Sequence, residues 1–171
     1  MTALDLDGTL LDYASEGPRP RVNLRVLTDL CARRVRHVAI CTNQGGLPWW
    51  AMGVTRRDGR PYPSPDQFLF RLAVAVGWLD QYGIAVSAVR VCVFHPKAPD
   101  AAIQRAARLV RAGMRSILVP DWHIYTRADA RKPAPLMLRS VGALEYWGDS
   151  DEDQGAALAA SVPFVRVARF V

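Results

Sequence analysis

The chain has 171 residues, half of them hydrophobic, and a formal net charge of +6. This length predicts a single domain over 1–171 with a substantial core, and the charge favours anionic partners in general. No apolar run approaches the ~20 residues of a membrane span, acidic residues at 5 and 7 argue against a signal peptide, and three scattered cysteines favour a cytoplasmic protein.

Apolar runs alternate with amphipathic segments along the whole chain. In chain order, strands are predicted at about 2–6, 36–41, 88–94, 144–148 and 163–168, and helices near 22–34, 65–82, 100–113, 134–143 and 152–160. This alternation predicts an α/β fold in which a doubly wound, Rossmann-like parallel sheet lies between two helical layers. A monomer is compatible with these features.

The first apolar run ends in Asp5-Leu6-Asp7-Gly8-Thr9. Residues two apart on a strand project to the same side, so Asp5 and Asp7 can face one substrate while Leu6 enters the core. Gly8 allows the backbone to turn tightly. One carboxylate at such a position can attack phosphorus, and the other can protonate the leaving oxygen and later activate water.

Two further segments carry groups that bind phosphate. Thr42, with the backbone N–H groups of Asn43 and Gln44, follows the second predicted strand and can take phosphate oxygens. Lys132 supplies a positive charge, and because the chain has two lysines against twenty arginines, a compact point charge is favoured there.

The last of these segments is Gly148-Asp149-Ser150-Asp151-Glu152-Asp153. Asp149 and Asp153 supply oxygen ligands, and hard oxygens beside a phosphate suit Mg²⁺ better than zinc. Because ligands of parallel sheets bind at the carboxyl ends of the strands, we expect all these groups at one sheet edge.

The four segments resemble those of the haloacid-dehalogenase (HAD) phosphohydrolases over nearly the whole chain. Thr-Asn-Gln-Gly followed by Arg-Lys-Pro is similar to the branch with histidinol-phosphate and heptose-bisphosphate phosphatases and the 3′-phosphatase module of polynucleotide kinase. The resemblance implies a nucleophile, Asp5, and a general acid/base, Asp7, whose carbonyl reaches the metal. It also implies phosphate-binding groups and Mg²⁺ ligands: Thr42, Asn43 and Lys132 for phosphate, and Asp5, Asp7, Asp149 and Asp153 for the metal. Asp153 is expected to touch the metal directly, through water, or by steadying Lys132.

The chain departs from the heptose-phosphatase type at its zinc loop. Cys92 and His95 match the first half of that loop, but the second half is Ala128-Asp129-Ala130. Two ligands do not make a closed tetrahedral site, so a buried cysteine and a polar histidine are expected instead. Asp121 and His123 are the alternative partners that could complete a zinc site.

Two stretches between Thr42 and Lys132 are predicted to hold loops or a small flap rather than a lid: 47–65 and, apart from its helix, 97–129. The possible substrate contacts are Gln44, Trp49, Trp50, Arg56, Arg57 and Arg131. The tryptophans can stack on a base while the arginines hold backbone phosphates, or they can close a hydrophobic corner while the arginines are solvated.

These features predict a Mg²⁺-dependent phosphomonoesterase that acts through an aspartyl-phosphate. A nucleic-acid 3′-phosphate end or a nucleotide is one substrate class, and a sugar or histidinol-type phosphate is the alternative. A third hypothesis is a non-catalytic HAD-like binding module, which would be expected to lack Asp5 or Asp7.

Overall fold

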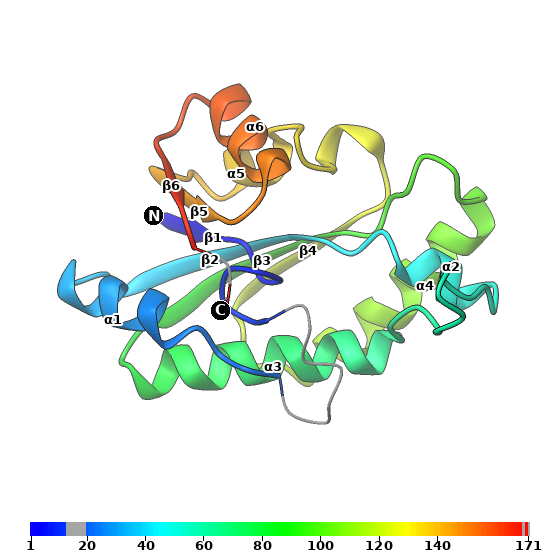
Figure 1. Ribbon diagram of the computed structural model, residues 1–171, viewed down its shortest axis with the longest axis horizontal. Coiled ribbons are helices and arrows are strands. Elements are labelled where there is room, and N and C mark those ends of the chain that lie inside the picture. Colours follow the sequence, from blue (N-terminus) through cyan, green and yellow to red (C-terminus); the bar gives the residue numbers. More distant parts are fainter. Residues whose placement is uncertain (13–19, 169, 171) are drawn as a thin grey trace.

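The computed structural model describes residues 1–12, 20–168 and 170. Its parallel strands form one six-stranded sheet with the order β4-β3-β2-β1-β5-β6 (Figure 1). The strands are β1 (Thr2–Leu4), β2 (His37–Asn43), β3 (Ala85–Cys92), β4 (Asp121–Tyr125), β5 (Glu145–Gly148) and β6 (Phe164–Arg166). The helices are α1 (Leu24–Ala32), α2 (Leu47–Ala51), α3 (Pro65–Gln81), α4 (Asp100–Met114), α5 (Leu136–Ser140) and α6 (Asp151–Ala160), with a 3₁₀ turn η1 (Ala128–Ala130).

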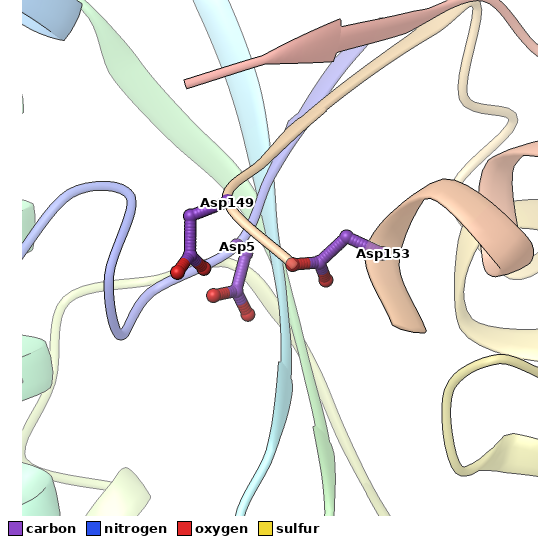
Figure 2. A group of neighbouring side chains, drawn as sticks. All are labelled: Asp5, Asp149 and Asp153. Atoms are coloured by element: carbon purple, nitrogen blue, oxygen red, sulfur yellow. The ribbon is translucent and has the colours of Figure 1, made fainter. Parts of the chain in front are cut away.

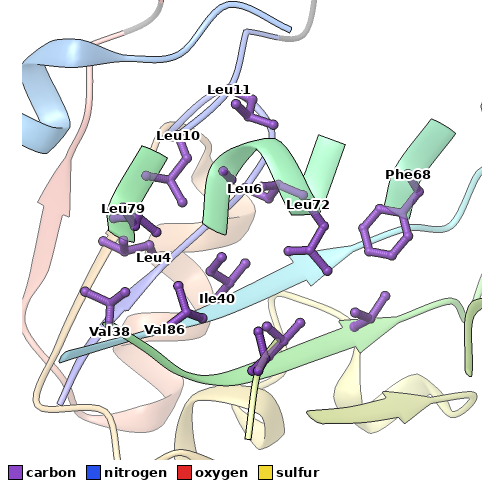
Figure 3. Packing of buried hydrophobic residues seen from close by; sticks show 14 of the residues in the cluster. Leu4, Leu6, Leu10, Leu11, Val38, Ile40, Phe68, Leu72, Leu79 and Val86 are labelled. Carbon is purple, nitrogen blue, oxygen red and sulfur yellow. The ribbon is translucent and has the colours of Figure 1, made fainter. Parts of the chain in front are cut away.

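Helices cover both faces of the sheet, which confirms the predicted Rossmann-like α/β fold without a large insert. On β2, Val38 and Ile40 belong to one hydrophobic cluster, whereas Ala39 and Cys41 belong to the other. The first cluster includes residues of α1, α3 and α4, and the second includes residues of α5 and α6. Figure 3 shows strand residues of the first cluster beneath Leu72 and Leu79 of α3.

The strand order reverses at β1, whose neighbours are β2 and β5. The chain builds one half of the sheet from β1 to β4 and then returns to add β5 and β6 on the other side. Ligands of open α/β sheets bind beyond the carboxyl ends of the strands at such a switch point. The residues that follow β1, β2 and β5 therefore occupy the favoured position for a site.

The sheet has one strand more than predicted, because β4 lies inside the stretch 97–129 that was expected to be irregular outside its helix. In β4, Ile124 is buried, whereas Asp121 and His123 are exposed at the edge of the sheet. A short edge strand with polar residues on one side has a weak sequence signal. The stretch 47–65 likewise contains the short helix α2.

The other elements match their predicted positions with shifted ends. The largest change is α5, which covers only Leu136–Ser140 because Pro135 precedes it and Gly142 has a positive φ of 58°. Among the described residues, no helix is long and apolar enough to cross a membrane.

Candidate functional site

Three aspartates converge beyond the carboxyl ends of β1 and β5 (Figure 2). One carboxylate oxygen from each of Asp5, Asp149 and Asp153 lies within 4.8 Å of the other two, and all three residues are buried. Asp5 directly follows β1, and its N–H donates to the carbonyl of Trp147 on β5 at 2.9 Å. Backbone pairing between two central strands thus fixes Asp5 at the carboxyl end of β1.

Local sequence explains how Asp149 and Asp153 reach the cluster. Ser150 is the N-cap of α6, and it forms a capping box with Asp153, whose Oδ2 accepts from the Ser150 N–H at 3.1 Å. A Cβ on Gly148 would lie 2.5 Å from Cβ of Asp153. A Cβ on Gly8, where φ is +88°, would lie 2.5 Å from Cγ of Asp149. Both glycines make room for a carboxylate.

Lys132 joins two of the three aspartates. Its Nζ lies 2.6 Å from Oδ1 of Asp5 and 2.6 Å from Oδ1 of Asp153. A third contact, at 3.0 Å, is with the hydroxyl of Tyr146 on β5. The sequence predicted the ammonium beside the carboxylates but not Tyr146, because an aromatic residue inside a strand is typical of the core.

Burial and charge determine the protonation of this cluster. Burial raises the pKa of Asp5 to about 8 against the opposing effect of Lys132, and the nearby Asp153 and Asp7 carboxylates raise it further. Burial alone would lower the pKa of Lys132, but Asp5, Tyr146 and Asp153 hold it well above its usual value. Burial therefore favours the protonated form of the Asp5 carboxyl, whereas Lys132 favours its charged form.

The pKa of Asp153 moves in the opposite direction. Burial would raise it, but the Lys132 charge and the hydrogen bonds from Lys132, Ser150 and Tyr146 lower it. Oδ1 of Asp153 accepts from Lys132 and Tyr146, and Oδ2 accepts from the N–H and hydroxyl of Ser150. These four hydrogen bonds fix the Asp153 carboxylate in the position where it accepts from the Lys132 ammonium.

The donor set fits a hard divalent cation. Three buried carboxylates offer only oxygen atoms, which is the ligand chemistry of Mg²⁺. Because both oxygens of Asp153 already accept hydrogen bonds, Asp5 and Asp149 are the two carboxylates better placed to hold the ion. A cation there would stabilise the charged form of Asp5 and release its proton.

The Asp7 side chain lies apart from the aspartate cluster and has partners of its own. Its Oδ1 accepts from Nη2 and Nε of Arg71 on α3 at 2.7 and 3.2 Å, and its Oδ2 accepts from Nε2 of Gln44 at 2.7 Å. The Asp7 carboxylate is thus bound by Arg71 and Gln44, and the expected contribution of its carbonyl to the metal stays a prediction. Arg71 lies one helical turn from Phe68 and one from Ala75, both on the buried face of α3. An arginine on the buried face of a predicted helix indicates a buried acidic partner, and the sequence analysis missed this signal.

Thr42 and Asn43 end β2 and Gln44 follows it, but the three residues differ in what they could offer a phosphate. Thr42 is buried, and its hydroxyl accepts from Nε2 of Gln44 at 3.1 Å. The N–H of Gln44 donates to the carbonyl of Cys92 at 2.7 Å, so its predicted use for phosphate is wrong. The Asn43 side chain accepts from the Lys132 N–H at 3.1 Å and donates to the Lys132 carbonyl at 3.3 Å. It therefore clamps the backbone that carries the lysine.

The stretch 47–64 packs against the loop after β3 through contacts between aromatic rings. Trp49 lies 6.5 Å from Tyr62 and 5.2 Å from His95 between ring centroids, and the Arg56 guanidinium lies 5.7 Å from the Tyr62 ring. Trp50 is half-buried and Arg57 is exposed. Tyr62 of this segment lies close to the loop after β2, because a Cβ on Gly46 would lie 3.1 Å from its ring.

Arg131 lies on the same side of the site. Its Nη1 donates to the carbonyl of Phe94 at 3.2 Å, and a Cβ on Gly45 would lie 2.6 Å from that nitrogen. A glycine in the loop after β2 therefore lets the guanidinium pack against the backbone next to Gln44. This places Arg131 beside the predicted phosphate-binding segment.

The zinc-loop residues do not form a second cluster. Within the described part of the chain, the three aspartates are the one group of three or more potential ligands close enough to share an ion. The Cys92 thiol donates to the Arg127 carbonyl at 3.9 Å, and burial raises its pKa to about 11. Nδ1 of His95 accepts from the N–H of Lys97 at 3.2 Å. Both side chains are therefore occupied by local hydrogen bonds.

Comparisons with known proteins add no relative to this description. A scan of protein-family models, a search of curated proteins and a search of solved structures each gave no significant match. The chain is thus an α/β protein with a six-stranded parallel sheet and a buried aspartate cluster at its switch point.

Proposed function

We propose that this protein is a HAD-type, Mg²⁺-dependent phosphomonoesterase that acts through an aspartyl-phosphate. The observation that carries the proposal is the Asp5 carboxylate at the end of β1, buried between the Lys132 ammonium at 2.6 Å and the carboxylate of Asp149. An anionic nucleophile can attack a phosphate dianion only where positive charge offsets the repulsion, which is about 4 kcal/mol per charge pair at 4 Å. Lys132 and a cation held by Asp5 and Asp149 supply that charge.

The proposed reaction has two steps, and each conserves atoms and protons. Asp7, which is the carboxylate partner of Arg71 in the resting protein, must enter the reaction protonated. In the first step, an Asp5 oxygen bonds to phosphorus, the ester P–O bond breaks, and Asp7 gives its proton to the leaving oxygen. In the second, Asp7 takes a proton from water, the water oxygen bonds to phosphorus, and the bond to Asp5 breaks. The products are an alcohol and inorganic phosphate, and both aspartates return to their starting states.

Each neighbouring side chain has a role in this scheme. The Thr42 hydroxyl, which accepts from Gln44, would donate to a phosphoryl oxygen, and Asn43 fixes the Lys132 backbone. Arg71 and Gln44 hold the two oxygens of Asp7 in one orientation. Bound Mg²⁺ would neutralise phosphoryl charge and keep Asp5 ionised.

A phosphate-release screen with Mg²⁺ tests the proposal. We expect turnover of at least one class among 3′-phosphorylated oligonucleotides, nucleotides, histidinol phosphate and heptose bisphosphates, with loss of activity in EDTA. Asp5→Asn keeps the shape of the side chain but loses its nucleophilicity, so this folded variant should be inactive. Retention of more than a few per cent of wild-type phosphate release by Asp5→Asn would reject the mechanism.

Two substrate classes are proposed, and different residues support them. Trp50 and the exposed Arg57 support a nucleic-acid 3′-phosphate end or a nucleotide, because they can stack on a base and hold a backbone phosphate. The contacts of Trp49 with Tyr62 and His95 favour packing over base stacking, and this supports a small-molecule phosphate.

Alanine variants of Trp50 and Trp49 separate these classes. If Trp50 stacks on a base, Trp50→Ala should weaken binding of a phosphorylated oligonucleotide by ~1–3 kcal/mol and leave a small aryl phosphate unaffected. Trp49→Ala serves as the packing control and should lower thermal stability and harm both substrates equally. The same pattern in Trp50→Ala would favour the small-molecule substrate.

A further inference from the structure

The ammonium of Lys132 has a complete set of hydrogen-bond acceptors without any ligand. An ammonium has three N–H donors. The three acceptors of Lys132 are Oδ1 of Asp5 at 2.6 Å, Oδ1 of Asp153 at 2.6 Å and the Tyr146 hydroxyl at 3.0 Å. Because Asp5 is the proposed nucleophile, its contact is the one that must change during the reaction. The contacts with Tyr146 and Asp153 are then left to hold the lysine.

The packing of Tyr146 holds its hydroxyl in contact with Lys132. The residue is fully buried on β5, next to β1 in the sheet, and its ring packs 6.2 Å from the ring of Phe164 between centroids. Its hydroxyl accepts from Lys132 and donates to Oδ1 of Asp153 at 2.7 Å, a shorter contact than the 3.4 Å to the Cys41 carbonyl. A rigid ring on a core strand therefore joins the lysine to its permanent carboxylate partner.

We propose that Tyr146 is a positioning residue that, together with Asp153, anchors the Lys132 ammonium while its third N–H passes from Asp5 to a phosphoryl oxygen. This inference rests on the proposed function for the role of Lys132. It explains why a hydroxyl stands among the buried side chains of β5, where phenylalanine would pack equally well. It also gives Asp153 a role at the lysine, with the cation left to Asp5 and Asp149.

The lysine content of the chain allows a direct test by NMR. Lys97 and Lys132 are its only lysines, so lysine-selective ¹⁵N labelling yields two side-chain signals, which Lys97→Arg assigns. Lys97 is exposed, whereas Lys132 is buried. Protons of the Lys132 ammonium should exchange slowly with water in the wild type. In Tyr146→Phe, which keeps the ring and removes the hydroxyl, we expect exchange to be at least tenfold faster.

Ligand binding provides the second readout. Tyr146→Phe should weaken binding of inorganic phosphate to the Mg²⁺-loaded protein by about tenfold, the loss expected for a hydrogen bond to a charged group. Its Mg²⁺ affinity should stay unchanged, because Asp5 and Asp149 are intact. The matched control is Phe164→Leu, which disturbs the same packing without touching the hydroxyl. It should lower stability and leave the exchange rate and phosphate binding unchanged.

The outcomes separate this inference from the proposed function. The positioning role of Tyr146 would be wrong if the Lys132 ammonium protons exchanged at the wild-type rate in Tyr146→Phe, or if Phe164→Leu accelerated their exchange equally. Either result would count even if the wild type is an active phosphatase. Faster exchange of the Lys132 ammonium protons in Tyr146→Phe, but not in Phe164→Leu, would support the positioning role of Tyr146. Absence of phosphomonoester hydrolysis by the wild type would reject the proposed function and leave that support intact.

Discussion

Arg71 Nη2 on α3 lies 2.7 Å from Oδ1 of Asp7 in the turn after β1, and both side chains are largely shielded from water. Nη2 also donates to the Asp12 carbonyl at 2.9 Å. One guanidinium therefore ties a helix on one face of the sheet to the loop that carries the proposed general acid. Because a shielded ion pair keeps its geometry, Arg71 fixes where Asp7 presents its carboxyl.

Removal of Arg71 should impair proton transfer to the leaving group. For Arg71→Met we expect kcat to fall by ~10-fold or more on an alkyl phosphate and by less on an aryl phosphate, because the poorer leaving group depends more on the acid. Steady-state kinetics on the two substrates measures this difference. Arg33→Met, which removes an ion pair with Glu145 at the start of β5, should change neither rate. Equal losses on both substrates in Arg71→Met would argue against a role through Asp7.

Gly8→Ala should disrupt the cation site. A Cβ there would lie 2.5 Å from Cγ of Asp149, and the φ of +88° adds backbone strain. Gly53→Ala is the matched control, because Gly53 also has a positive φ, +71°, but no atom within 4 Å of the added carbon. Each variant should lose about 1–2 kcal/mol of stability from the backbone alone. Calorimetry should show that Mg²⁺ raises the Tm of Gly53→Ala but no longer that of Gly8→Ala.

The raised pKa of Asp5 predicts how stability depends on pH. This pKa rises from 3.8 to about 8 on folding, so the unfolded chain loses the proton first as pH increases. The metal-free protein should therefore lose stability between about pH 4 and pH 8. Thermal unfolding in EDTA across this range should show a slope that Asp5→Asn lacks.

Mg²⁺ should reverse that trend. The proposed ion would bind the carboxylate form of Asp5, so the rise in Tm caused by Mg²⁺ should grow with pH over the same range. A rise in Tm that is independent of pH, or that persists in Asp5→Asn, would place the ion elsewhere.

A buried arginine on β3 links β4 to the rest of the sheet. Arg90 donates to Oδ2 of Asp121 at 2.5 Å and to the Ser140 hydroxyl at 3.0 Å. The hydrogen bond from Arg90 lowers the pKa of Asp121, so the stabilisation is present above the usual aspartate pKa and is lost as pH falls through the lowered value.

Asp121→Asn should remove that stabilisation. We expect a loss of about 1–2 kcal/mol near neutral pH, toward the lower end because the Asp121 side chain is 57% exposed. The difference from the wild type, measured by urea unfolding, should vanish in acid. Asp129→Asn, in the exposed pair with Arg127, should cost less stability than Asp121→Asn, because water screens that pair.

The sequence by itself was sufficient for the fold class and for the end of the sheet at which the aspartates meet. Strand and helix periodicity depends on neighbouring residues, and a parallel sheet must place the ends of its strands at one edge. Asp5 and Asp149 could therefore be grouped from their positions after apolar runs, whereas Lys132 was grouped with them through the resemblance of Arg-Lys-Pro. The capping box of Ser150 and Asp153 is equally local, because three residues along the chain contain it.

Only the tertiary structure determined which side chains form hydrogen bonds, ion pairs and packing contacts with one another. Arg71 and Asp7 are 64 residues apart, and their pairing depends on how α3 packs across the sheet. Tyr146 is indistinguishable from a core aromatic until Lys132 is placed against its hydroxyl. Likewise, nothing local indicates that Asn43 turns to the Lys132 backbone or that Trp49 packs on His95. Hydrogen bonds and ion pairs are directional and short-ranged, so their partners follow from the packing of distant elements, which residue pattern alone does not specify.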